Sequence, residues 1–550
     1  MNRERTRWLC ALLMAAALMA LTCALSGVVF QTNDDNTIVS VASGGVSGEG
    51  EPYNSFTSYG YGWLLCRLYS LCADIPWHGL GMFLLQGLCL AAVLRSVFFL
   101  CAQKGAAWWK GLAGFLALYA GVAMKFMCYL QFTATAGYCS AAAACLLFTL
   151  PEGRKARRLN GLCALGVMAC ALLLRPKGGL LGLPVPLLAA LYRGLKKDRA
   201  SFRWGCALAA VAIGLMLSDA LLTRLLVPGL AESQTFDEAS AVVLDYQNTD
   251  HTYALALEVT DWNPALCACF RNWNLLFDHR FSTENLTRLA QAVERDTPSP
   301  TLIQVLHKTL SVLRRYQEFG WNALGWGLCS LWLMAVLFRR RDWQGLLLTL
   351  ALWLSLGAVI ALFYGWLNRL PDRVAFVYAL PVYALLLMLL LEQQPPVPLA
   401  ACALLVAAAA LVTVGLRGED IWVRNNPRRE MRAQITQQAN DYAAAHPDML
   451  YVTDVTQGFY AFETETPPVN LVEWGSGLVR SPAYQHKFRR LGYPEGLDTR
   501  HLADENVRLL MSSSASLRRL QDVLEADGLD WTLVEEESFG SLTLCRLQKR

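Results

Sequence analysis

The sequence is poor in ionisable residues and in clustered metal-binding residues. Only 17% of its 550 residues are charged, and its seven histidines stand apart from one another. Most of its 17 cysteines lie inside hydrophobic runs, and among the polar segments only Cys267 and Cys269 lie close together. This distribution argues against a disulfide framework and against a zinc site. The net charge of +4 is small, so no nucleic-acid partner is indicated.

Long apolar runs are what the sequence has in abundance. Apolar residues make up 55% of the chain, and runs of about 17–25 residues, each long enough to cross a bilayer, recur along it. The first run follows Arg3, Arg5 and Arg7 and is longer than a typical signal-peptide core, so we interpret it as an uncleaved span. About eleven spans are predicted in all: Trp8–Phe30, Trp77–Cys101, Gly111–Leu130, Gly137–Leu150, Leu159–Leu174, Gly179–Tyr192, Trp204–Val227, Trp321–Phe338, Trp343–Trp366, Val374–Leu391 and Pro398–Leu416.

The distribution of lysine and arginine predicts the orientation of these spans. With the N-terminus in the cytoplasm, the cytoplasmic loops hold most of the basic residues, whereas residues 31–58 hold none. The short outer loops then contain only Arg175, Lys177, Arg369 and Arg373. We therefore expect a multi-pass protein of the cell membrane with a cytoplasmic N-terminus and an extracytoplasmic C-terminal domain. This topology leaves no sizeable cytoplasmic domain for a nucleotide-sugar site.

The predicted fold is an α-helical polytopic membrane protein with a small extracytoplasmic α/β domain at its C-terminus. Residues 1–416 form the transmembrane domain, with extracytoplasmic loops at 31–75 and 228–320, and residues 417–550 form the soluble domain. Within loop 31–75, the stretch Leu64–Leu71 is too short to span and is expected at the membrane interface. The periodicity of the tail predicts helices and strands: helices at Pro427–Ala445 and Leu517–Leu524, and strands at Met449–Thr453, Trp531–Val534 and Leu542–Leu544.

Two adjacent acidic residues, Asp34 and Asp35, follow the first span within a few residues. Carboxylates so close to a membrane are costly unless they are solvated, paired or used in chemistry. One interpretation is that the pair ends the helix in water. The other is that it forms a catalytic site, to which the preceding Asn33 also belongs.

With this topology, Asn33-Asp34-Asp35 resembles the polytopic glycosyltransferases of the GT-C superfamily, which keep a catalytic acid in the first extracytoplasmic loop and often carry a soluble C-terminal domain. The wider segment, from Asn33 through Ala42-Ser43-Gly44 to Ile75–Leu80, is also similar to uncharacterised multi-spanning membrane proteins of Gram-positive bacteria. The resemblance implies transfer of a sugar from a polyprenyl-phosphate-linked donor to a glycan, lipid or protein of the cell envelope, on the outer face of the bilayer.

The chemistry of this transfer suggests roles for the two acids. Asp34 would take the proton of the acceptor, and Asp35 would be its neighbour or a ligand of a divalent cation, Mg²⁺ or Mn²⁺, or the two roles would be reversed. The donor phosphate needs positive charge on the same face. Arg175 and Lys177 lie in one tight outer hairpin, and Arg369 and Arg373 lie in another, just after Tyr364. The alternative for these basic residues is ordinary anchoring to lipid headgroups.

Two charges lie well inside predicted spans, at Lys125 and Asp219. Charges inside a membrane usually face the bundle interior and pair, so a structural ion pair between the two is the simplest hypothesis. Two other functions stay open. A transporter or flippase of lipid-linked glycans would need functional charges in the bundle and matching halves. A non-catalytic assembly factor or sensor of the envelope would bind a partner through its tail.

Overall fold

The computed structural model describes residues 2–315, 317–394, 427–455, 461–462 and 466–549. Its contacts divide the chain into two compact units. Unit 1 comprises residues 1–31, 76–220 and 300–426, and unit 2 comprises residues 32–75, 221–299 and 427–550. Each unit is therefore assembled from segments that lie far apart in the sequence. The predicted boundary between residues 416 and 417 lies outside the described residues.

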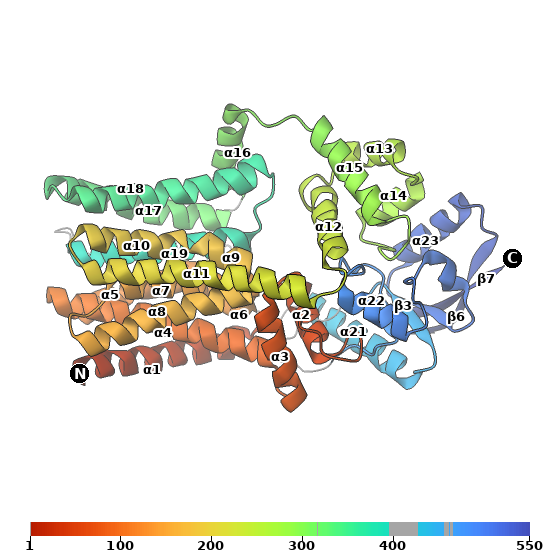
Figure 1. Cartoon of the computed structure of the whole chain (residues 1–550), viewed down its shortest axis with the longest axis horizontal. Helices are drawn as coiled ribbons and strands as arrows, with labels where there is room; N and C mark the ends of the chain where they lie inside the picture. The colour runs from red at the N-terminus through yellow and green to blue at the C-terminus, as the bar shows by residue number, and fades with distance from the viewer. Residues whose placement is uncertain (1, 316, 395–426, 456–460, 463–465, 550) are drawn as a thin grey trace. The chain divides into compact units, whose positions relative to one another are not determined.

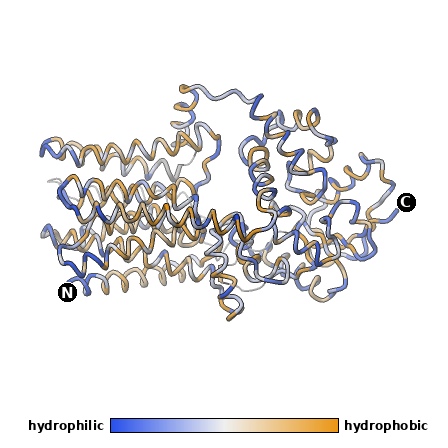
Figure 2. The backbone as a smooth tube through the Cα atoms, in the orientation of Figure 1, coloured by the Kyte–Doolittle hydropathy of each residue, from blue (hydrophilic) through white to orange (hydrophobic). Residues whose placement is uncertain are grey.

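In the part of the chain that the structure describes, nine helices are long and apolar enough to cross a membrane. Their apolar character is visible as the continuous hydrophobic colouring of the long helices in Figure 2. These candidate spans are built from α1 (Asn2–Ser26), α4 (Trp77–Lys104), α5 (Trp108–Leu118) with η1 (Tyr119–Ala123) and α6 (Met124–Cys128), α8 (Arg154–Leu174), α9 (Pro176–Gly182) with α10 (Pro184–Leu195), α11 (Arg199–Leu226), α17 (Gln317–Arg339), α18 (Trp343–Ile360) with η3 (Ala361–Trp366), and α19 (Asp372–Gln393).

A tenth predicted span corresponds to the shorter apolar helix α7 (Phe132–Phe148), and the last, Pro398–Leu416, lies outside the described residues. The prediction of an α-helical polytopic protein is confirmed. All 17 residues of α7 are buried, and most of α19 is buried as well. The two helices approach so closely that a Cβ on Gly137 would lie 2.8 Å from the Cα of Val377. The centre of unit 1 is thus a pair of helices shielded by the others.

The first span ends earlier than predicted, because Gly27 takes a left-handed conformation with φ of 77° and closes α1. The following residues form a short strand, β1 (Val29–Phe30), parallel to β2 (Tyr129–Leu130). The Gln31 amide then donates to the Leu130 carbonyl at 2.8 Å. Non-helical backbone in this unit is therefore paired, as a low-dielectric environment requires.

Unit 2 combines short helices with a five-stranded sheet, and Figure 1 labels several of these elements, such as α12, α23 and β7. Its helices are α2 (Asn33–Ser43), α3 (Tyr59–Leu71), α12 (Leu230–Ser240), η2 (Ala241–Tyr246), α13 (Asp250–Val259), α14 (Pro264–Arg271), α15 (Thr283–Asp296), α21 (Pro427–Ala445), α22 (Pro482–Arg490), η6 (Thr499–Ala503) and α23 (Ser514–Ala526). Its strands are β3 (Leu450–Thr453), β4 (Leu471–Glu473), β5 (Val507–Met511), β6 (Trp531–Phe539) and β7 (Leu542–Lys549).

The sheet has the order β4-β3-β5-β7-β6, with β3 parallel to β4 and β5, and β7 antiparallel to β5 and β6. The prediction of an α/β domain at the C-terminus is confirmed. One apolar core joins all three segments of the unit, since Val46, Phe270 and Phe488 belong to the same buried cluster. Residues 32–75 are therefore part of a folded unit and share its core.

Candidate functional site

The two adjacent acids lie in the first turn of α2, in unit 2. Thr32 caps this helix in an extended conformation, and its hydroxyl donates to Asp35 Oδ2 at 3.4 Å. The N-terminal end of a helix favours negative charge, so the position suits both carboxylates. Asn33 is exposed and Asp34 is half-buried, whereas Asp35 is completely buried, with 0% of its surface exposed. The burial of Asp35 rules out, for this residue, the interpretation that the acids simply end a helix in water.

Helix α22 of the C-terminal segment holds the loop that follows α2. The Arg490 guanidinium donates to the carbonyl of Ser47 at 2.9 Å, and His486 lies 3.0 Å from the Glu51 carboxylate. Gly48 has φ of +88°, and a Cβ there would lie 2.0 Å from Arg490 Nη1. Glycine is needed at this position both for the backbone conformation and for the close approach of the arginine. The C-terminal segment thus holds the loop that follows the helix carrying the acidic pair.

Unit 1 contains a polar cluster made by residues that are distant in sequence. Lys125 on α6 forms an ion pair with Asp372 on α19 at 2.8 Å, and the two side chains are 18% and 37% exposed. The Gln31 side chain donates to both oxygens of the same carboxylate, at 3.2 and 3.3 Å. Lys125 therefore pairs with an acid that the sequence did not suggest as its partner. The pairing of Lys125 with Asp219 stays a prediction.

The residues proposed for donor binding all lie in unit 1. Arg175 precedes α9, and its guanidinium stacks over the Phe132 ring at 5.0 Å, while Lys177 is exposed. Tyr364 is buried on η3, and Arg369 and Arg373 are half-buried in and after the turn that follows. Stacking on an aromatic ring fixes a guanidinium without neutralising its charge. The role of these five residues in substrate binding, and of the four basic ones in phosphate binding, stays a prediction.

A second polar cluster in unit 1 was not predicted from the sequence. Arg95 on α4 is fully buried and pairs with Glu4 of α1. Its guanidinium also donates to the carbonyl and the hydroxyl of Thr149, at 3.0 and 2.9 Å, and Asn160 donates to Glu4 at 3.1 Å. A buried charge inside a bundle must be paired, and here Glu4 of α1 and Thr149 at the end of α7 are the partners of Arg95. The position of Arg95 inside a predicted span is the signal that could have revealed it.

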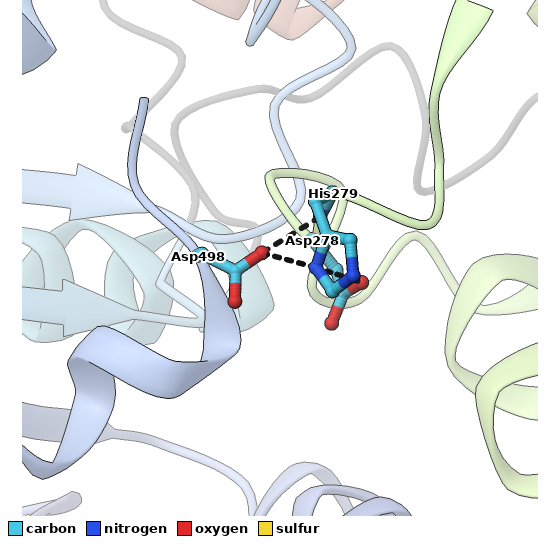
Figure 3. A group of neighbouring side chains, drawn as sticks. All are labelled: Asp278, His279 and Asp498. Carbon is cyan, nitrogen blue, oxygen red and sulfur yellow. Dashed lines mark hydrogen bonds and ion pairs between the residues drawn. The ribbon is translucent and has the colours of Figure 1, made fainter. Parts of the chain in front are cut away.

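Unit 2 has a further cluster of ionisable residues at Asp278, His279 and Asp498. Their ligand atoms lie within 4.8 Å of one another, and Figure 3 shows Asp278 and His279 on one loop facing Asp498 on another segment. His279 Nδ1 lies 2.5 Å from Asp498. Burial raises the pKa of Asp498, but hydrogen bonds from the backbone and side chain of Arg500 and from His279 outweigh it and lower the pKa to about 2.

The spacing of these three side chains would admit a metal ion, but hydrogen bonds and ion pairs within the protein already occupy the carboxylate oxygens of both aspartates. Arg280 donates to both oxygens of Asp278, at 3.0 and 2.9 Å, and the Thr499 hydroxyl donates to the same carboxylate. An arginine that engages a carboxylate in this way neutralises the charge that a cation would need. The cluster therefore fits an ion-pair network that joins residues 278–280 to the C-terminal segment. A divalent cation at Asp34 and Asp35 stays a prediction.

The fold and these clusters define an α-helical polytopic membrane protein with a folded α/β unit built from residues 32–75, 221–299 and 427–550. No family model matches the sequence, and no curated protein matches it. Similar solved structures include a crystal structure of ArnT from Cupriavidus metallidurans in the apo state, which is 15% identical with a TM-score of 0.42 over 98% of each chain. ArnT from the same organism bound to undecaprenyl phosphate is 14% identical with a TM-score of 0.38 over 97% of each chain.

Proposed function

We propose that this protein is a membrane glycosyltransferase. It moves a sugar from a polyprenyl-phosphate-linked donor to an acceptor of the cell envelope, on the outer face of the membrane. The observation that carries the proposal is the full burial of Asp35 beside the half-exposed Asp34, on a helix that directly follows the first span. A buried carboxylate is costly to maintain, and buried acids in this position are expected where they serve chemistry.

The different burial of the two acids suggests different roles. Asp34 is accessible enough to contact an acceptor hydroxyl, so we assign it the role of general base. As the acceptor oxygen bonds to the anomeric carbon, the bond from that carbon to the donor phosphate breaks. The acceptor proton passes to Asp34, and the lipid phosphate leaves. Asp35 would position its neighbour or bind a divalent cation that neutralises the departing phosphate.

The basic residues of unit 1 would serve the leaving group. Arg175, Arg369 and Arg373 offer planar guanidinium groups, which match the oxygens of a phosphate, and Lys177 adds an exposed point charge. The resemblance of Asn33-Asp34-Asp35 to the GT-C superfamily supports the same assignment. The lysine and arginine distribution supports placing this chemistry on the outer face.

The test is sugar transfer from short-chain polyprenyl phosphate and diphosphate sugars by the purified chain, with and without Mg²⁺ or Mn²⁺. The variants are Asp34→Asn and Asp35→Asn, with Asp74→Asn as the control because Asp74 is an exposed acid of the same loop. Loss of a general base should lower turnover by about 10²–10⁴-fold, and Asp74→Asn should leave it unchanged. Folding of each variant is checked by size-exclusion chromatography and circular dichroism.

Two results would count against the proposal. Full turnover in both Asp34→Asn and Asp35→Asn would remove the acids from the mechanism. Absence of donor binding by the unmodified chain, across all of the lipid-linked sugars, would favour a transporter or an envelope assembly protein.

A further inference from the structure

Helix α16 (Leu302–Arg315) in unit 1 carries apolar side chains on two separate faces. Val305 and Val312 are buried, at 8% and 1% exposure. A second apolar set is exposed at 74%, 79%, 52% and 67%: Leu302, Ile303, Leu306 and Leu310. At about 100° per residue these four positions fall within roughly one third of the helix circumference. Gln304 and Ser311 lie on the opposite side, so α16 has a packed face, an exposed apolar face and a polar face.

The packed face of α16 is seated on the π-helical turn η3, which ends a candidate span. A Cβ on Gly365 of η3 would lie 2.7 Å from Val305 Cγ1, 3.1 Å from the Val305 carbonyl oxygen and 3.1 Å from Thr309 Oγ1. Such proximity requires glycine and fixes α16 against the end of the span. The exposed leucines therefore belong to a docked helix.

Two exposed tryptophans show at which level of the membrane α16 lies. Trp366, 52% exposed, ends the candidate span that includes η3, and Trp321, 44% exposed, begins the candidate span that directly follows α16 in the sequence. Tryptophan is enriched where hydrocarbon meets headgroups. Figure 1 shows α16 turned across the axis of α18, at the end where η3 lies. This is the position expected of a helix at the boundary between hydrocarbon and headgroups.

We propose that the exposed apolar face of α16 is a lipid-binding surface that inserts into the boundary layer of the bilayer. Leu362, on the candidate span against which α16 packs, is an exposed apolar residue as well, at 53%. Residues 297–315 contain no Asp or Glu, whereas Lys308 lies on the polar side of the helix. An apolar face flanked by basic residues and free of acids is typical of helices that lie in a membrane interface. The partner is therefore the bilayer itself.

The experiment is site-specific photo-crosslinking of the full chain in lipid nanodiscs containing phosphatidylglycerol and phosphatidylcholine. A benzophenone amino acid is placed at Leu306 or at Leu310, and at Gln304 as the control on the opposite side of the same helix. Because all three side chains are exposed, the substitutions should not disturb packing. Each preparation is checked for a monodisperse elution profile, and Ile303 provides a further apolar position if one variant fails.

Intact-mass analysis should find lipid adducts at Leu306 and Leu310 in severalfold higher yield than at Gln304. Equal lipid yields at the apolar and polar positions would overturn the proposal, because the surface would then have no preferred side. Cross-links from Leu306 or Leu310 to a second copy of the chain would overturn it in favour of a protein interface. Absence of any adduct at the apolar positions would mean that the face points into water, and would overturn it as well. None of these outcomes depends on glycosyl transfer.

Discussion

Replacing Lys125 by methionine removes the cation that lies 2.8 Å from Asp372 and keeps a side chain of similar length. The effect can be bracketed from the exposure of the two side chains, 18% and 37%. Fully exposed ion pairs contribute about 0–1 kcal/mol, whereas removing one partner of a fully buried pair costs about 3–5 kcal/mol. This pair lies between the two limits. We expect Lys125→Met to lower the free energy of unfolding by about 2 kcal/mol, because Asp372 keeps the two hydrogen bonds from Gln31.

A double-mutant cycle isolates the interaction between the two side chains. Lys125→Met, Asp372→Asn and the double variant are unfolded by SDS in mixed micelles, and helix content is followed by circular dichroism. Directly contacting residues couple by about 0.5–3 kcal/mol, and we expect about 1 kcal/mol for this half-buried pair. The same cycle with Asp219→Asn measures the alternative pairing that the sequence suggested.

Absence of measurable coupling between Lys125 and Asp372 would refute a stabilising ion pair, because a half-buried pair at 2.8 Å should contribute measurably to stability. Stronger coupling of Lys125 to Asp219 than to Asp372 would refute the observed pairing as the dominant one.

Three further results are expected in unit 2. Gly48→Ala should raise the rate of hydrogen exchange in the loop at residues 44–51. Gly492→Ala is the control, because Gly492 has a similar φ of +93° but open space where a Cβ would lie, and it should leave exchange in this loop unchanged. Equal effects of the two substitutions would show that the contact between Gly48 and Arg490 does not hold the loop. Burial lowers the pKa of Lys487 from 10.5 to about 8, so the folded state binds fewer protons than the unfolded state between these values. The free energy of unfolding should therefore rise with pH in that window, by up to about 1.4 kcal/mol per unit, and pH titration of Lys487→Met should show no such rise. The lowered pKa of Asp498 predicts a loss of stability in acid: the contribution of this carboxylate to the free energy of unfolding is complete above about pH 4 and is lost as the pH falls towards about 2. Comparing the acid unfolding of Asp498→Asn with that of the unmodified chain would measure this contribution.

Elements with a strong local signal were predicted from the sequence. The apolar runs specified the candidate spans, because crossing a bilayer demands length and hydrophobicity in one continuous segment. The helix at Pro427–Ala445 has the bounds that its helical spacing predicted, and the strand at 450–453 lies within its predicted range. In both cases the information lies within the element itself.

Elements that depend on distant partners were missed. Strand β5 is defined by pairing with Leu450 on one side and Cys545 on the other, and neither partner lies near Val507 or Leu509 in the sequence. The segment between residues 228 and 320 was treated as a loop, although Ser282 caps α15 by accepting from the Asn285 amide. A serine before a periodic apolar pattern is a local helix signal that could have been used.

The candidate site shows the same division between local and distant information. The position of Asp34 and Asp35 after a span was visible in the sequence, but the burial of Asp35 depends on packing that no local pattern specifies. Similarly, Lys125 was visible in the sequence as a charge inside a predicted span, yet its contact with Asp372 depends on how α6 and α19 pack. Tertiary packing decided which charges meet.

The composition of unit 2 has a consequence for the order of events during synthesis. Its core combines Val46 with Phe270 and with Phe488, so the first segment cannot bury its apolar residues until the last has been made. Contacts between such distant residues are slow to form, because a long stretch of chain must be closed first. The segment that carries the acidic pair is therefore expected to stay incompletely packed while the later spans are inserted. If the protein is a transferase as proposed, it would become competent only after the segment around Phe488 has been made and packed.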